Sequence, residues 1–161
     1  MRLGILSDTH DALTRTQSAV ELLREAGAEA LIHCGDLTSP PIVSACAALP
    51  FWFVLGNNDI DSVAELQSAA EDSGAVCLDW HGLVELAGRK IGIVHGHRRS
   101  DVRQILSAQP EYLLCGHSHA QRDELIDGVR WINPGALFRA REYTVALLDL
   151  ETGALQSLSL T

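Results

Sequence analysis

Five short polar motifs, each directly after an apolar segment that reads as a strand, constrain the fold of this chain more than any other feature. They are Asp8-Thr9-His10, Gly35-Asp36, Gly56-Asn57-Asn58-Asp59, His95-Gly96-His97 and Gly116-His117-Ser118-His119. Functional sites of α/β folds lie beside the carboxyl ends of strands. Because no local segment can join motifs from such distant parts of the chain, we expect an α/β fold that collects them at one site.

Apolar periodicity and turn residues predict alternating strands and helices in the first half of the chain. The expected strands cover residues 3–6, 30–32 and 51–55. The expected helices cover residues 14–26, 40–48 and 62–73.

The second half is expected to be mostly β-structure. Short strands are predicted at 77–78, 82–86, 90–94 and 113–114, with one helix at 101–108. A meander of antiparallel strands is predicted at 120–125, 129–132, 143–150 and 155–160. Two packed sheets with helices outside satisfy both halves, and a chain of 161 residues fits a single domain spanning 1–161.

The charge balance limits the partners that the chain can have. A net charge of −9 at neutral pH argues against an extended nucleic-acid surface. A small anionic substrate remains compatible, since two divalent ions beside Asp8 and Asp36 would make the local charge positive. The start of the chain lacks a signal-peptide pattern, and no apolar stretch has membrane-spanning length. We therefore expect a soluble, cytoplasmic protein that contacts no membrane.

Four cysteines are present, and no two of them form a CxxC pair. A structural zinc site of that kind or a thioredoxin-like motif is therefore poorly supported. We expect these side chains to be small, buried and reduced.

The motif side chains form a ligand set suited to divalent metal ions. Asp8 and His10 lie two residues apart, so an extended segment would point both to one face. Carboxylate, amide and imidazole ligands together suit Mn, Fe, Ni or Zn. Alone, Asp36 also fits a turn or helix cap, and the Gly56–Asp59 segment also fits a simple turn. The joint occurrence of all five motifs at strand ends favours a metal site.

Several other polar residues lie outside this set. His33 and His81 belong to none of the motifs, and we assign them structural roles. Arg98, Arg99, Arg139 and Arg141 could hold a phosphate group through bidentate hydrogen bonds. For most of them a solvated surface position is the simpler interpretation.

In this order the motifs resemble those of the calcineurin-like metallophosphoesterase superfamily, and more closely its small phosphodiesterases of the YfcE type. The resemblance extends from Asp8 to Asn133-Pro134-Gly135. It implies a four-layer αββα sandwich of two mixed sheets flanked by helices. It also implies a dinuclear metal site at the strand ends between the sheets.

The resemblance further implies a role for each ligand. Two divalent ions are expected, with Mn²⁺ favoured and Ni²⁺, Fe²⁺, Zn²⁺ or Mg²⁺ compatible. A hydroxide held between them would attack phosphorus in line. Asp36 would bridge the ions and, with Asn57, His95 and His117, would be catalytic. The first ion would be held by Asp8, His10, Asp36 and His119, and the second by Asp36, Asn57, His95 and His117.

Two positions depart from the pattern of relatives. Asn58 stands where larger phosphatases of the superfamily carry a histidine near the leaving group, and asparagine cannot act as a general acid. This favours phosphodiesters with good leaving groups, or protonation by water or His97. Ala136 follows Asn133-Pro134-Gly135 where serine is frequent in relatives. We expect Asn58, His97 and Arg98 to contact the substrate.

Alternatives from other classes are weaker. The retromer subunit of this fold works mainly as a protein-interaction scaffold and has lost part of its metal set, whereas this chain keeps the full set. A haloacid-dehalogenase-type phosphatase would need an acidic residue where His10 stands, and a dinucleotide-binding protein would need GxGxxG. The predicted activity is therefore that of a metal-dependent phosphodiesterase acting on a small phosphoester. Because relatives often self-associate, a homo-oligomer remains open.

Overall fold

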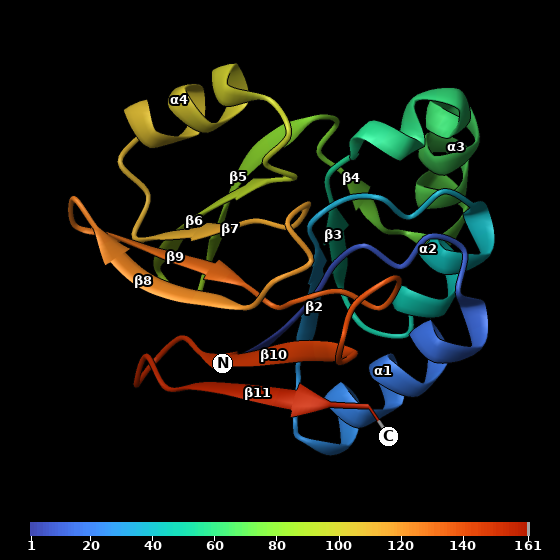
Figure 1. Ribbon diagram of the computed structural model, residues 1–161, viewed down its shortest axis with the longest axis horizontal. Helices are drawn as coiled ribbons and strands as arrows, with labels where there is room; N and C mark the ends of the chain where they lie inside the picture. Colours follow the sequence, from blue (N-terminus) through green and yellow to red (C-terminus); the bar gives the residue numbers. More distant parts are fainter. Residues whose placement is uncertain (161) are drawn as a thin grey trace.

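The computed structural model describes residues 1–160, in which strands and helices alternate along the first half of the chain. Figure 1 shows the resulting arrangement of sheets and helices. The helices are α1 (Leu13–Glu25), α2 (Pro40–Cys46), α3 (Val63–Ser73), α4 (Arg99–Ser107) and the 3₁₀ helix η1 (Asn57–Ser62). The strands are β1 (Arg2–Leu6), β2 (Ala30–His33), β3 (Phe51–Phe53), β4 (Val76–Cys77), β5 (His81–Leu86), β6 (Arg89–Val94), β7 (Tyr112–Leu114), β8 (Arg122–Ile126), β9 (Val129–Asn133), β10 (Thr144–Asp149) and β11 (Leu155–Ser159).

The strands form two mixed sheets. One has six strands in the order β11-β10-β1-β2-β3-β4, and the other has five in the order β5-β6-β7-β9-β8. The central strands β1 to β4 are parallel, and so are β6, β7 and β9. Antiparallel strands occupy the β10–β11 edge of the first sheet and both edges of the second. The prediction of two mixed sheets is confirmed.

Three hydrophobic clusters define the layers of the fold. Leu23 of α1 and Leu66 of α3 pack against Leu31 and Phe53 on the outer face of the six-stranded sheet. Side chains of both sheets, such as Ile32 and Ile93, make a second cluster between them. A third cluster joins α4 to the outer face of the five-stranded sheet, with Ile105 at its centre. Successive strand residues point to opposite faces, which is why one strand supplies two clusters. The predicted αββα sandwich is therefore correct.

The predicted C-terminal meander is wrong in one respect, because its four strands are divided between the two sheets. Strands β8 and β9 pair in the five-stranded sheet, where β9 also lies parallel to β7. Strands β10 and β11 instead extend the six-stranded sheet beyond β1. The connection from Asn133 to Thr144 crosses between the sheets. Apolar alternation predicts a strand but does not specify its partner, which tertiary packing decides.

Smaller differences concern strand ends and side-chain burial. Strand β3 ends at Phe53, two residues earlier than expected, and the segment predicted as a turn after it forms η1. The cysteines carry free thiols, of which those of Cys34, Cys46 and Cys115 are buried and that of Cys77 is half-buried. Among the described residues, no helix is long and apolar enough to cross a membrane.

Candidate metal centre

The five motifs converge at the carboxyl ends of the central strands, between the two sheets. Asp8 and His10 follow β1, Asp36 follows β2, and the remaining motifs follow β3, β6 and β7. Parallel strands bring their carboxyl ends to the same edge of a sheet, and the two sheets meet face to face. This topology explains how residues from Asp8 to His119 reach one place.

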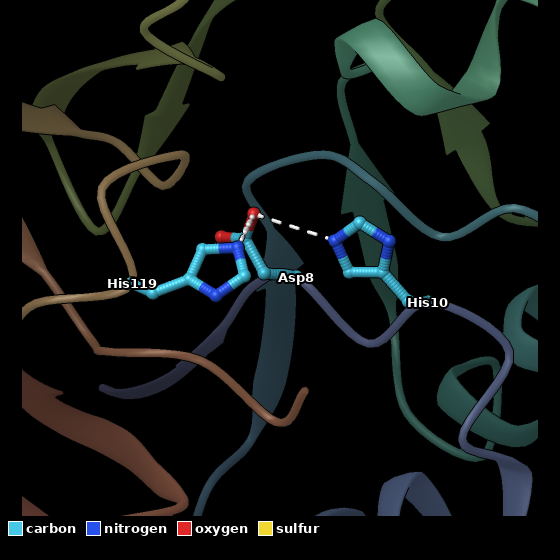
Figure 2. A group of neighbouring side chains, drawn as sticks. All are labelled: Asp8, His10 and His119. Carbon is cyan, nitrogen blue, oxygen red and sulfur yellow. Dashed lines mark ion pairs between the residues drawn. The ribbon is translucent and has the colours of Figure 1, made fainter. Parts of the chain in front are cut away.

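Asp8 lies at the centre of the first group of side chains, and its carboxylate is fully buried. Its Oδ2 accepts hydrogen bonds from the Ser7 hydroxyl at 2.6 Å and from the His117 backbone N–H at 3.0 Å. Within residues 1–160, its Oδ1 has no hydrogen-bond partner. Figure 2 shows this oxygen between two imidazoles, 3.2 Å from Nε2 of His119 and 4.0 Å from Nε2 of His10. A buried carboxylate oxygen without a donor is costly unless a cation occupies the space before it.

Asp36 holds the second position, with only 2% of its side chain exposed. Its Oδ1 accepts the Asn58 backbone N–H at 2.8 Å, and its Oδ2 accepts the Asn58 amide at 2.7 Å. Nε2 of His10 and Nε2 of His95 each lie 3.3 Å from the same Oδ2. Burial alone would raise the pKa of Asp36. The hydrogen bond and positive charge of His95, together with the two Asn58 donors, outweigh burial and hold this pKa below its usual range.

His95 is oriented by a backbone carbonyl. Its Nδ1 lies 2.8 Å from the Cys34 carbonyl oxygen, which can only accept, so Nδ1 carries the proton. Nε2 then points toward Asp36 and lies 3.1 Å from the Asn57 amide oxygen. Fixing one ring nitrogen in this way presents the other nitrogen for ligation, as second-sphere carbonyls do in metal sites.

The side chains fit divalent cations by geometry and by chemistry. Asp8, His10 and His119 place three ligand atoms within 4.8 Å of one another, and Asp8, Asp36 and His95 do the same. Nε2 of His10, like Oδ1 of Asp8, is buried and has no hydrogen-bond partner among the described residues. Imidazole nitrogen with carboxylate oxygen is a donor set for borderline divalent metals.

The two remaining predicted ligands lie at the same centre but outside these compact groups. Asn57 contacts His95 through its amide oxygen. The ring of His117 lies 5.1 Å from that of His95. In the structure, Asp8 belongs to both compact groups, whereas the family resemblance implies that Asp36 is the shared ligand. Which carboxylate bridges stays a prediction.

The backbone around the centre is strained. Five of the seven predicted ligands have φ between 42° and 65°, namely Asp8, His10, Asp36, His117 and His119. This left-handed region is uncommon for residues other than glycine. Such strain persists only where surrounding structure enforces it, and it concentrates at functional sites.

The predicted substrate residues border the centre in different ways. Asn58 is engaged with Asp36 through both of its donors. The ring of His97 lies 5.3 Å from that of His95 and 6.1 Å from that of His117. Burial and neighbouring positive charge lower the pKa of His97. Arg98 lies over the indole of Trp80, with 3.9 Å between Cζ and the ring centroid.

Sequence reasoning missed the role of Asp59. This fully buried carboxylate accepts three backbone N–H groups, from Gly56 at 2.7 Å, Asp36 at 2.9 Å and Thr38 at 2.7 Å. It therefore ties the loop that carries Asn57 to the loop that carries Asp36. An acidic residue three positions after a helix cap is the available signal, since it reads as a capping box.

The two histidines outside the motifs have structural surroundings, as expected. His33 is fully buried, with Nε2 3.1 Å from the Thr9 hydroxyl oxygen and Nδ1 accepting the Gly35 N–H at 3.1 Å. His81 lies on β5, and its Nδ1 is 3.8 Å from Oδ1 of Asp101.

The fold and the site together indicate a class of proteins. Comparison with known proteins identifies the family. Residues 1–153 match the calcineurin-like phosphoesterase superfamily domain, and the chain belongs to this family. The resemblance predicted from the motifs is thereby confirmed.

Particular relatives narrow the comparison. The chain is 31% identical to phosphodiesterase MJ0936 of Methanocaldococcus jannaschii over 94% of each chain. A solved archaeal phosphodiesterase superposes with a TM-score of 0.89 at 29% identity, covering 99% of this chain and 100% of that one. The E. coli phosphoesterase YfcE shares the fold, with a TM-score of 0.72 at 20% identity over the full length of both chains. The chain is thus a homologue of phosphodiesterases.

Proposed function

We propose that this chain is a dinuclear metal-dependent phosphodiesterase. The observation that carries the proposal is the buried Oδ1 of Asp8. In the part of the chain that the structure describes, this oxygen has no hydrogen-bond donor and faces imidazoles from three strand ends. The matched relatives support the same chemistry, since MJ0936 is named as a phosphodiesterase.

Under this proposal Asp8, His10, Asp36 and His119 hold one ion, and Asp36, Asn57, His95 and His117 hold the other. Mn²⁺ is the favoured metal. When bound, such a pair of ions supplies a hydroxide nucleophile at neutral pH and stabilises charge on the phosphoryl oxygens. The chain itself fixes the ligands: the Cys34 carbonyl orients His95, and Asn58 donates a hydrogen bond to each oxygen of Asp36.

The leaving group must be protonated or be stable as an anion. Asn58 cannot donate a proton as a general acid, and it is already engaged with Asp36. We assign this role to His97, which lies beside His95 and His117. Burial lowers the pKa of His97, which makes its protonated form less available at neutral pH. Diesters with good leaving groups should therefore react fastest.

The proposal extends to the setting of the enzyme. We propose a cytoplasmic protein acting on a small phosphoester, with no membrane partner and with self-association open to measurement by size-exclusion chromatography. The scaffold alternative would require loss of metal ligands, whereas this chain retains all seven predicted ones.

Hydrolysis of bis-p-nitrophenyl phosphate and p-nitrophenyl phosphate, with Mn²⁺ and other divalent ions, tests the proposal. We expect metal-dependent cleavage that favours the diester in the wild type. Asp36→Asn should lose activity. Asp61→Asn, which makes the same change at an exposed carboxylate in the same region, should keep it. Circular dichroism would check that both variants fold. Absence of diester cleavage with every metal would contradict the proposal.

A further inference from the structure

Two arginines lie over aromatic rings whose neighbours include His97 and His10 of the candidate metal centre. One pair joins Trp80, between β4 and β5, to Arg98, between β6 and α4. The other pair is Phe138–Arg139, between β9 and β10. The residues of the two pairs come from three different connections of the fold, and no local motif links them. Their shared geometry around one centre is the basis of the inference.

The Trp80–Arg98 pair adjoins the side of the centre that holds His95. The ring of Trp80 lies 6.2 Å from that of His97, and the ring of His97 lies 5.3 Å from that of His95. The guanidinium of Arg98 covers the face of the indole at 3.9 Å. Arg98 also directly precedes α4, whose first turn carries Asp101.

The Phe138–Arg139 pair lies next to His10, on the other side of Asp36 from His95 in the chain of contacts. The rings of Phe138 and His10 lie 4.8 Å apart, and Arg139 lies over Phe138 at 5.1 Å. Asp36 stands between the two sides, because His10 and His95 each place Nε2 3.3 Å from its Oδ2. The centre is thus flanked by one cationic group beyond His10 and another beyond His97.

Neither guanidinium is neutralised within the part of the chain that the structure describes. Arg98 and Arg139 form no side-chain hydrogen bond or ion pair there, whereas Arg89, Arg122 and Arg130 pair with carboxylates. Stacking on an aromatic ring orients a guanidinium and leaves its N–H edge available. That edge matches a phosphate group through two parallel hydrogen bonds. Because the chain has a net charge of −9, two such cations near one site favour an anionic ligand there.

We propose that the Trp80–Arg98 and Phe138–Arg139 pairs are anion subsites, and that the substrate is a phosphodiester with a further phosphate on each side of the scissile phosphorus. This inference rests on the proposed function, because the centre between the subsites must be the place of diester cleavage. A short oligonucleotide has this chemistry. The absence of a broad basic surface limits recognition to the few nucleotides nearest the centre.

The dinucleotide TpT and its doubly end-phosphorylated form pTpTp test the inference. We expect the wild type to cleave the central diester of pTpTp with a kcat/KM at least about tenfold above that for TpT, the gain of one charge-assisted contact. Arg98→Ala and Arg139→Ala should each reduce this ratio, and the double variant should bring it close to one. The matched double variant Arg99→Ala/Arg141→Ala removes the same charge from exposed neighbours and should keep the ratio.

Binding supplies a second readout that does not depend on turnover. Calorimetric titration of the Asp36→Asn variant with pTpTp and TpT should show tighter binding of pTpTp, lost in the Arg98→Ala/Arg139→Ala background. Equal binding and equal cleavage of the two dinucleotides would overturn the subsites. If bis-p-nitrophenyl phosphate is cleaved but pTpTp is not preferred, only this inference fails. If no diester is cleaved but pTpTp binds preferentially through both arginines, the subsites stand and the proposed function fails.

Discussion

Asp59 illustrates, at the scale of the residue, how a side chain that touches no predicted ligand atom can position two ligand loops. Its two oxygens accept hydrogen bonds from the N–H groups of Asp36 and Thr38, in the loop after β2, and of Gly56, in the loop after β3. Burial raises the pKa of Asp59, while these donors favour its charged form. Removing the carboxylate would leave buried N–H groups without acceptors.

We expect Asp59→Asn to lower the free energy of unfolding by about 1–3 kcal/mol. The side-chain NH2 group of asparagine would face a backbone N–H, which would then lack an acceptor. The affinity for Mn²⁺ should fall with it, since both loops move. Asp61→Asn, on the exposed side of η1, should change neither quantity. Urea unfolding and calorimetric titration measure the two effects. Unchanged Mn²⁺ affinity in a folded Asp59→Asn protein would show that Asp59 does not position the site.

His33 yields a prediction about pH. Burial lowers its pKa to about 3, so the folded protein holds it neutral. The unfolded chain protonates it near the ordinary value of about 6.5, and stability is therefore lost as the pH falls below that value. The full contribution is present above pH 6.5, and each unit below costs at most about 1.4 kcal/mol.

The comparison of wild type with His33→Gln isolates this effect. In the presence of EDTA, the unfolding free energy of the wild type should fall more steeply between pH 6.5 and pH 5 than that of the variant. Other buried histidines contribute equally to both proteins, so the difference in slope belongs to His33. Identical slopes would mean that His33 does not titrate on unfolding.

At the scale of the element, two glycines allow the loops after β3 and β7 to lie close to the buried carboxylates of Asp36 and Asp8. A Cβ on Gly56 would collide with Oδ1 of Asp36, and a Cβ on Gly116 would collide with the Ser7 hydroxyl and lie 2.7 Å from Oδ2 of Asp8. Both glycines follow parallel strands. The close approach of the loops after β3 and β7 to these carboxylates therefore depends on residues without side chains.

Gly116→Ala should displace Asp8 and weaken metal binding at least about tenfold, the size of loss that changes to the surroundings of a metal ligand typically cause. Gly88→Asn serves as the control, because a Cβ there meets open space and asparagine tolerates its φ of +74°. Calorimetric titration with Mn²⁺ measures the effect. Wild-type affinity in Gly116→Ala would mean that the loop after β7 can relax without moving Asp8.

Elements and ligands differed in how far the sequence could predict them. The expected strand at 30–32 and helix at 62–73 lie within one residue of β2 and α3, because Gly35 and Gly74 punctuate them clearly. Asp8, Asp36 and His95 were predicted as ligands, and the structure brings them together. The sheet that receives β10 could not be predicted, since an alternating strand fits either sheet. The positions of Trp80 and Phe138 were equally hidden, because loops are placed by tertiary packing.

At the scale of the whole molecule, the sandwich gathers buried negative charge at one place. Asp8 and Asp36 are both buried between the sheets in a chain of net charge −9. Ions that bind the folded chain stabilise it by mass action, by about 2.7 kcal/mol at a hundredfold excess over the dissociation constant. Mn²⁺ should therefore raise the melting temperature above that measured in EDTA.

Melting temperatures of Asp8→Asn and Asp61→Asn, measured with Mn²⁺ and in EDTA, separate binding at the metal centre from binding to surface carboxylates. The Mn²⁺-dependent rise should shrink in Asp8→Asn and persist in Asp61→Asn. An equal rise in both variants would assign the stabilisation to surface carboxylates instead.

The central claim is that two ions bind between the sheets, and anomalous diffraction from a crystal grown with Mn²⁺ tests it most directly. We predict two anomalous peaks about 3.5–4 Å apart, as in dinuclear hydrolases. One peak should contact His10 and His119, and the other His95, Asn57 and His117, with a carboxylate of Asp8 or Asp36 between them. A single peak, or peaks away from these side chains, would contradict the account.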